Sequence, residues 1–445
     1  MFFRPAAFFF SAKSFSYLKF KKLCATIYNG FMFCIHQTYY TTERKMTNIA
    51  ILGFGVVGGG VAELITKNYN EVTRLGNDEI NIKYILDLRD FPDSPFGDRV
   101  VHDYNIILED KSVSTVIEVM GGSHPAYEFT VSALKAGKNV ITSNKEVVAG
   151  FGDEFLKLAK ENNVSYRFEA AVGGGIPVIS PLINCVGQNK IKEIRGILNG
   201  TTNYILTKMF SFGDSFESAL CDAQAKGYAE KNPDADILGI DAARKITILT
   251  AIATGNLVSP DSIHTEGITS IRKNDVAAAE LLGCSIKLVG RCIATNDAPY
   301  VMVAPFIISA ESPLSTVNGV YNAVEVLSEP LDNVMFYGRG AGAGPTASAV
   351  VGDLMQVMRT GAAATAPVFT KSEKTAPFDS FESKHYLAFD KASVEALKKV
   401  FGDISLLNVE DAAFVTEKMS EAALASKLSL LLADGVSPLS HIRLL

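Results

Sequence analysis

Short apolar runs alternate with helical stretches along the first part of the chain. The runs are NIAIL from residue 48, IKYILDL, STVIEVM, KNVITS and VSYRFEA. Between them stand stretches such as VAELITKN and TVSALKAGK, whose apolar residues lie three and four positions apart. Apolar runs of this length are typical of strands buried on both faces, and a helix between two such strands makes their pairing parallel. The pattern predicts an α/β fold with a Rossmann-type parallel sheet.

The pattern changes after about residue 172. Strands are predicted at KEIRGIL, SIKLVGRCIA and APYVMVAPFII. Helices are predicted at IPVISPLIN, with Pro177 in the first turn, at TTNYILTKMF, and at Asp214, which has capping-box spacing to Glu217. We interpret residues 173–334 as a mixed α+β domain for substrate binding and dimerisation. A stretch rich in glycine and alanine, GRGAGAGPTASAVVGDLMQVMR, then leads into a helix.

The end of the chain has the pattern of a linker and a small module. Residues 361–381 are rich in Ala, Thr, Pro and Ser, which is typical of a linker. Residues 382–445 read as strand HYLAF, helix SVEALKKVFG, strands ISLLNVE and AAFVTEKM, helix EAALASKLSLLLA and strand SHIRLL. This order predicts a small ferredoxin-like module.

Composition and charge narrow the class of protein. Of the 445 residues, 48% are apolar and 20% are charged, the balance of a globular protein. The formal net charge is −6, but residues 1–45 hold seven basic residues and one acid, so the remainder carries 35 basic and 47 acidic residues, or −12. This excess of acid argues against a nucleic-acid partner. Residues 1–45 are interpreted either as a targeting segment or as a non-native, disordered leader before a natural start at Met46, and no apolar run has the length of a membrane span.

The first chemical motif is a glycine turn directly after the first predicted strand. It runs Gly53-Phe54-Gly55-Val56-Val57-Gly58 and opens a helix, which is the setting in which such glycines bind a dinucleotide. They allow the backbone to approach the pyrophosphate, and the helix offers its N-terminal amides to the negative charge. The alternative is a merely structural turn.

The residues after the second strand bear on cofactor preference. Asp87 ends that strand, where a ribose-binding carboxylate of an NAD site falls. Arg89 could instead serve a 2′-phosphate, and Asp87 could be an ordinary acid of a surface turn. The choice between NAD and NADP therefore stays open.

Two further motifs contain lysines. Ser143-Asn144-Lys145 ends the fourth predicted strand, so Lys145 is either directed into a ligand cleft or solvated at the surface. Asp241 and Lys245 lie four apart, on one face of a predicted helix. They could form a surface ion pair. The segment ITILTAIATG that follows is apolar on nearly all sides, however, so we expect this helix to be buried, and buried charges need partners or a function.

The second of these motifs identifies a resemblance. It reads Ala223-x3-Gly227-Tyr228-Ala229-Glu230-x-Asn232-Pro233-x2-Asp236-Ile237-x-Gly239-x-Asp241-x3-Lys245. This pattern resembles the signature of the homoserine dehydrogenases, and EAAVGGGIP, NGTTNY and GAGAG follow in the family's order, so the likeness runs from Asn48 to about Arg359. The family reduces L-aspartate 4-semialdehyde to L-homoserine with NADH or NADPH, on the route to threonine and methionine.

The resemblance implies roles for individual residues. It makes Lys245 the proton donor, Lys145 a second lysine close to nicotinamide and substrate, and Asp241 the group that orients Lys245 or the substrate. The implied substrate residues are Glu230, Asp241, Tyr228, Asp236 and Gly175. The implied cofactor residues are Phe54, Gly55, Val56, Val57, Gly58, Met120, Gly121, Lys145 and Gly342. A sodium ion is implied at Glu169, Val172, Gly174 and Ile176, mostly through backbone carbonyls.

The resemblance also bears on organisation. The GAGAG segment returns the chain to the nucleotide domain, which is therefore expected to comprise residues 46–172 and 335–360. Members of the family are homodimers or homotetramers. The module of residues 382–445 resembles the threonine-sensing ACT domains, yet AFDKASVEAL lacks their usual glycine turn, so an inert or assembly role is at least as well supported.

Two alternative functions fit the sequence less well. An aspartate-semialdehyde dehydrogenase needs a cysteine nucleophile near a histidine, and the cysteines here are scattered without such a context. Their spacing also argues against a zinc site or disulfides and makes the cytoplasm the default compartment. A nucleotide-responsive regulator would need a basic DNA-binding face and would leave Glu230, Asp241 and Lys245 without a role.

Overall fold

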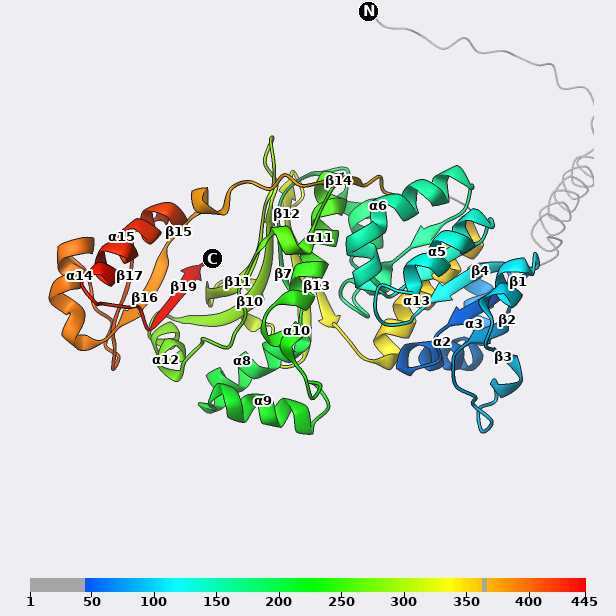
Figure 1. The fold of residues 1–445 in the computed structure, drawn as a ribbon, viewed down its shortest axis with the longest axis horizontal. Helices are drawn as coiled ribbons and strands as arrows, with labels where there is room; N and C mark the ends of the chain where they lie inside the picture. The colour runs from blue at the N-terminus through cyan, green and yellow to red at the C-terminus, as the bar shows by residue number, and fades with distance from the viewer. Residues whose placement is uncertain (1–44, 362–365) are drawn as a thin grey trace, which may run out of the picture. The chain divides into compact units, whose positions relative to one another are not determined.

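The computed structural model describes residues 45–361 and 366–445, and residues Met46–Leu445 form one compact unit (Figure 1). The predicted leader lies outside the described residues, apart from Lys45. None of the helices in the described ranges is both long and apolar enough to cross a bilayer.

The first sheet is the parallel sheet that the apolar runs predict. Its strands are β1 (Met46–Leu52), β2 (Glu79–Leu86), β3 (Val100–Val101), β4 (Val113–Glu118), β5 (Asn139–Thr142) and β6 (Tyr166–Arg167). They pair in the order β3-β2-β1-β4-β5-β6, and every pair is parallel. This is the dinucleotide-binding order, in which ligands bind at the carboxyl ends of the strands where β1 and β4 diverge. The Rossmann prediction is confirmed.

Helices cover both faces of this sheet, since consecutive residues of β1 are apolar and point to opposite faces. Ile49 and Ile51 of β1 pack with α2 (Val56–Lys67), α3 (Tyr69–Gly76) and α13 (Ala343–Thr360). Ala50 and Leu52 face the cluster that contains α4 (Tyr104–Glu109), α5 (Ala126–Lys135) and α6 (Lys145–Glu161). Helix α13 therefore returns to the first sheet after the whole of the mixed region (Figure 1).

The second sheet is mixed and has nine strands. Its main path is β13-β12-β7-β10-β11-β19-β16-β17, with β9 beside β11. The strands of the middle region are β7 (Lys190–Ile197), β9 (His264–Thr265), β10 (Cys284–Ile293), β11 (Tyr300–Ser309), β12 (Tyr321–Glu329) and β13 (Asp332–Arg339). The hairpin β12–β13 was not predicted. In its edge strand β13, exposed positions alternate with half-buried ones, and the apolar run is short, covering only residues 334–337.

Helices α8 (Gly200–Phe212), α9 (Phe216–Ala225), α10 (Asp234–Ile237), α11 (Ile240–Thr254) and α12 (Lys273–Leu281) belong to this region. Two predicted helix starts are wrong. Ser215, not Asp214, caps α9 through the N–H of Ser218. The helix expected at IPVISPLIN begins later, at Ile179, and consists of α7 (Ile179–Pro181) and a π-helical turn (Leu182–Val186). The Glu169 carboxylate accepts the N–H groups at its start.

The C-terminal strands extend the second sheet. β16 (His385–Phe389) pairs with β17 (Ala412–Val415) and β19 (Ser440–Leu444), and β19 pairs in parallel with β11. Helices α14 (Val394–Phe401) and α15 (Glu421–Ala433) cover this part. The predicted strand ISLLNVE is wrong, since residues 404–410 are irregular. The segment expected to be a linker contains β14 (Thr370–Ser372), which pairs with β8 (Asn256–Val258), and β15 (Glu382–Ser383) pairs with β18 (Met419–Ser420).

Candidate active site

Two lysines from different parts of the fold converge on one carboxylate. Asp241 stands in the first turn of α11, and its Oδ2 lies 2.6 Å from the Nζ of Lys245 one turn later. Lys145, the first residue of α6, places its Nζ 3.1 Å from Asp241 Oδ1. Asp241 and Lys245 are only 6% and 8% exposed, so the predicted burial is confirmed. An ion pair between Arg244 and Glu146, at 2.7 Å, also joins α11 to α6.

The two ammonium groups keep Asp241 ionised. Burial by itself would raise the pKa of Asp241, but Lys245 and Lys145 outweigh that effect, and the net pKa lies far below its usual value. Hydrogen bonds from Lys245 and Asn199 act in the same direction. The site therefore holds one permanent negative charge between two lysines.

Asn199 is a part of this cluster to which no role was assigned from the sequence. Its side-chain amide donates to Asp241 Oδ2 at 2.9 Å and to Asp236 Oδ1 at 2.6 Å, and its Oδ1 accepts the N–H of Thr202 as the cap of α8. Lys245 also donates to the carbonyl of Leu198, at 2.8 Å. Burial and the neighbouring Asp241 raise the pKa of Asp236. The segment NGTTNY contained the signal, since an Asn before a helix is a preferred cap.

Of the other implied substrate residues, only Asp236 shares a hydrogen-bond partner, Asn199, with Asp241 in the part of the chain that the structure describes. Tyr228 is exposed, stacks edge-on with Tyr204, and its carbonyl accepts the hydroxyl of Thr201 at 2.6 Å. Glu230 is exposed as well, and its carbonyl accepts the side-chain amide of Gln224. Gly175 donates its N–H to the carbonyl of Arg339, and a Cβ there would lie 2.6 Å from Pro345. No polar contact in the described residues joins the Glu230 side chain to Asp241 or Lys245.

The three glycines of the first turn have three different environments. Gly53 adopts the left-handed region, with φ of 92°. A Cβ on Gly58 would lie 2.0 Å from the carbonyl oxygen of Gly53, so the turn and α2 can close only on a glycine. A Cβ on Gly55 would meet nothing within 4 Å. Protein packing therefore explains Gly53 and Gly58, whereas Gly55 faces open space that suits a pyrophosphate.

Asp87 is tied to both the glycine turn and Arg89. Its Oδ2 accepts the N–H of Phe54 at 2.8 Å, and both of its oxygens accept hydrogen bonds from the Arg89 guanidinium. These bonds, above all those from Arg89, lower the pKa of Asp87 to about 2. Arg89 is exposed and its guanidinium stands 5.0 Å from the centre of the Phe91 ring. A cofactor bound here therefore contacts the ion pair of Asp87 and Arg89 rather than a free carboxylate.

The remaining implied cofactor residues lie at the same sheet edge or at the start of α13. Met120 and Gly121 follow β4, and Asn144 caps α6 directly before Lys145. Gly342 caps α13 with φ of 116°, a backbone conformation that favours glycine. A Cβ on Gly174 would lie 2.3 Å from the carbonyl oxygen of Gly340, so the turns at 173–175 and 340–345 are packed tightly together.

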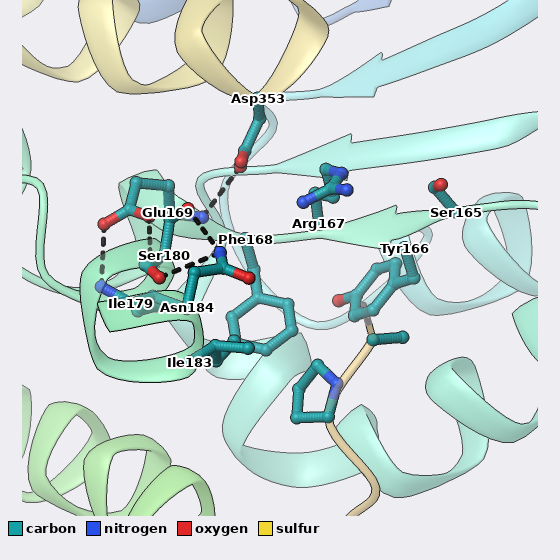
Figure 2. A pocket seen from close by; sticks show the side chains of 12 residues that line it. Ser165, Tyr166, Arg167, Phe168, Glu169, Ile179, Ser180, Ile183, Asn184 and Asp353 are labelled. Atoms are coloured by element: carbon teal, nitrogen blue, oxygen red, sulfur yellow. Dashed lines mark hydrogen bonds between the residues drawn. The ribbon is translucent and has the colours of Figure 1, made fainter. Parts of the chain in front are cut away.

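Figure 2 shows a pocket beside the implied cation loop. Both oxygens of Glu169 are engaged there: Oε1 accepts the N–H groups of Val178 and Ile179, and Oε2 accepts that of Ser180. Asp353, whose pKa burial raises to about 7, accepts the N–H of Glu169. Arg167 lines the same pocket. The side chain of Glu169 is thus committed to the protein backbone, and only its carbonyl is left for a cation.

These features define a class of protein. The sheet order and the glycine turn are those of a dinucleotide-binding domain. Lysines paired with a buried carboxylate suit a reaction in which a hydride is transferred to a carbonyl carbon and a proton to its oxygen. The chain matches the family model "Homoserine dehydrogenase, NAD binding domain" over residues 53–169 and the model "Homoserine dehydrogenase" over residues 177–355. It is an NAD(P)-dependent oxidoreductase that acts on a CH–OH group.

Individual relatives agree with these models. The homoserine dehydrogenase of Synechocystis sp. is 42% identical over 319 residues, which are 70% of this chain and 73% of that protein. The structure of a homoserine dehydrogenase from Thiobacillus denitrificans superposes with a TM-score of 0.84 at 32% identity, over 90% of this chain and 99% of that one. A hyperthermophilic archaeal homoserine dehydrogenase mutant in complex with NADPH has a TM-score of 0.60 at 30% identity, covering 70% and 97%. The chain belongs to the homoserine dehydrogenase family, whose reaction is the reversible NAD(P)H-dependent reduction of L-aspartate 4-semialdehyde to L-homoserine.

Proposed function

We propose that Lys245 is the proton donor of this reaction, that Lys145 is the second lysine at the reacting centre, and that Asp241 orients them. The observation that supports this proposal is the convergence of both ammonium groups on the buried Asp241. When bound, NAD(P)H supplies the hydride for the aldehyde carbon. The carbonyl oxygen then gains negative charge, which a lysine ammonium stabilises and finally neutralises by giving up its proton. Asp241 pairs with the ammonium group of Lys245 and aims it.

We assign binding of the ammonium group of the substrate to acidic residues in the region 173–334. The substrate carries an ammonium group, for which carboxylates are the natural partners. Glu230 and Asp236 are the candidates, because the carboxylate of Asp241 already has two lysines. Tyr228 and Gly175 complete the proposed pocket. Asn199 holds Asp236 and Asp241 in fixed relation to each other.

The cofactor lies, in this proposal, over Phe54 to Gly58 and along Asp87, Arg89, Met120, Gly121, Lys145 and Gly342. The open space at Gly55 and the exposure of Val56 at the start of α2 support this placement. Arg89 is exposed, and its hydrogen bonds to Asp87 use Nε and Nη2, so Nη1 remains for the 2′-phosphate of NADP. An archaeal relative has been solved with NADPH.

Replacement of Gly55 by alanine tests the cofactor placement. We expect Gly55→Ala to unfold at the wild-type temperature, since the new methyl group meets no protein atom. The dissociation constant for NADPH should rise at least about tenfold, because the methyl group occupies the path of the pyrophosphate. NADPH fluorescence titration and thermal denaturation measure the two effects. A wild-type affinity of this variant for NADPH would contradict the placement of the cofactor at this turn. Gly352→Ala, in the middle of α13, also meets nothing within 4 Å and is the matched control, which should bind NADPH like the wild type.

The proposed sodium site comprises the carbonyls of Glu169, Val172, Gly174 and Ile176. Carbonyl oxygens are the ligands that a hard monovalent cation prefers. No backbone hydrogen bond between described residues outside regular elements uses the carbonyls of Val172, Gly174 or Ile176, which leaves them available. The Glu169 carboxylate is not a ligand in this proposal, because backbone N–H groups surround it.

The organisation of the chain is proposed on the same basis. We assign residues 46–172 and 335–360 to the nucleotide domain, 173–334 to the substrate domain, and 382–445 to an ACT-like module. The packing of α13 on α2 and α3 supports the discontinuous first domain. A homodimer or homotetramer in the cytoplasm follows from the family resemblance and the cysteine usage. Addition of threonine to the enzyme assay separates a sensing from an inert module.

Oxidation of L-homoserine with NAD and with NADP tests the activity and the role of Arg89 together. The wild type should reduce both cofactors or one of them, and absence of turnover with both in a folded sample would contradict the proposed function. In Arg89→Ala we expect kcat/KM for NADP to fall about tenfold or more, as is typical for a lost charged hydrogen bond to phosphate, with little change for NAD. Equal losses of kcat/KM with NAD and NADP would contradict the role of Arg89 in binding the 2′-phosphate.

A further inference from the structure

Glu118 is a charged residue at the end of an otherwise apolar strand. It is the last residue of β4, and its side chain is fully buried. Its Oε1 accepts the N–H of Met120 at 2.8 Å, and its Oε2 accepts the hydroxyl of Thr142, the last residue of β5, at 2.6 Å. A buried acid at the carboxyl edge of a dinucleotide-binding sheet calls for a function or a full set of partners.

The hydrogen bonds of Glu118 continue into the proposed site along two arms. One arm is the N–H of Met120, at the start of the proposed cofactor loop. The other runs through Thr142, whose hydroxyl accepts the N–H of Asn144 at 2.9 Å. Asn144 caps α6 through the N–H of Glu146, and its amide donates to the carbonyl of Gly122 at 2.7 Å. The first residue of α6 is Lys145.

We propose that Glu118 is a positioning residue that holds the loop 120–122 and the N-terminus of α6 in the arrangement that binds the cofactor and directs Lys145 to Asp241. This inference rests on the proposed roles of Met120, Gly121 and Lys145. The ionised carboxylate is the competent form, since it accepts from both arms at once. A neutral acid or amide at this position would donate to Thr142, whose own proton would then lose its acceptor.

Glu118 changes its charge within the physiological range. Burial raises its pKa to about 7, against the lowering effect of hydrogen bonds from Thr142, Met120 and Asn144. Tyr166 of β6 is the titratable side chain that senses the charge of Glu118, and burial together with that carboxylate raises the pKa of Tyr166 well above its usual value, so it stays neutral. The ionised fraction of Glu118 therefore rises between pH 6 and pH 8. If the ionised form binds cofactor more tightly, binding must also favour loss of this proton.

Glu118→Gln is a nearly isosteric stand-in for the protonated acid. The measurement is the dissociation constant for NADPH, for variant and wild type, at pH 8 and at pH 6. We expect the variant to bind about tenfold more weakly at pH 8, the typical effect of a lost hydrogen bond to a charged group, and only about twofold more weakly at pH 6. The quantity compared is the ratio of the dissociation constant of the variant to that of the wild type at the same pH. Titration of the 2′-phosphate of NADPH affects both proteins equally and cancels in this ratio.

Two further variants complete the design. Thr142→Val removes the donor to Glu118 and also the acceptor of the Asn144 N–H. Its loss of NADPH affinity should therefore be larger at pH 8 than at pH 6 without vanishing at pH 6, and it replaces Glu118→Gln if that variant does not fold. Glu154→Gln removes a carboxylate later on α6, which contacts the hydroxyl of Tyr127, and should give a ratio of one at both pH values. A Glu118→Gln ratio that is the same at both pH values, including a ratio of one, would overturn the proposal. NADPH binding is read without turnover, so failure of the proposed activity would be seen separately in the homoserine assay.

Discussion

Replacement of Lys245 by methionine should lower the turnover number for L-homoserine oxidation by about a thousandfold or more, while NADPH still binds. Lys245 is the more deeply buried of the two lysines on Asp241, and its Nζ is held by Asp241 Oδ2 and the carbonyl of Leu198. A general acid contributes about 10² to 10⁴ in rate, and loss of a donor to the oxyanion removes transition-state stabilisation as well. Methionine keeps the length and apolar stem of lysine. Lys145 remains to pair with Asp241, so the fold is retained.

Steady-state kinetics and NADPH titration measure the two parts of this expectation. The control is Lys192→Met, which removes an exposed lysine paired with Glu329 at the surface and should leave both quantities unchanged. A Lys245→Met enzyme with near-normal turnover would show that the proton comes from another group, and Lys145 would then be the candidate. Loss of NADPH binding together with turnover would point to misfolding rather than to lost proton transfer.

Replacement of Asp241 by alanine should have the second largest effect, on stability as well as rate. It leaves the ammonium groups of Lys245 and Lys145 together without their shared carboxylate. Removal of one partner from a buried ion pair costs about 3–5 kcal/mol of folding free energy, and partial exposure of Lys145 places the expected loss near the lower end. Turnover should fall about a hundredfold or more, because Lys245 is no longer aimed.

The stability effect has a definite pH dependence. The pKa of Asp241 in the folded protein lies well below its usual value, so its contribution to stability is present in full above the unfolded-state pKa of about 4. It is lost as the pH falls from there toward the folded-state pKa. Urea denaturation of wild type and Asp241→Ala should therefore differ most at neutral pH and converge in acid. Asp261→Ala, at an exposed position, is the control, and equal stability of Asp241→Ala and wild type at pH 7 would contradict the ion-pair account.

The apolar pattern predicted five of the six strands of the first sheet, all but the two-residue β3, and a smaller share of the strands of the second sheet. Strands β1, β4 and β5 contain consecutive apolar residues that are buried on both faces of the sheet, and such runs are visible in one sequence. Strand β13 is half-exposed at an edge, and its short apolar run, residues 334–337, does not by itself distinguish a strand from another element. Residues 404–410 are apolar enough to suggest a strand, yet they remain irregular before β17. Nor does the pattern reveal that β19 pairs with β11 and continues the same sheet.

The sequence by itself determined the family, the glycine turn and the helix that carries Asp241 and Lys245, because each of these depends on residues close together in the chain. Only the tertiary structure brought Lys145 to Asp241, placed Asn199 between two acids, and paired Asp87 with Arg89. It also showed the hydrogen-bond partners of Glu118, a residue to which the sequence pattern assigned no role. The physical reason is that the pKa and the direction of a polar group are set by the groups around it, and those come from strands and helices far apart in the sequence.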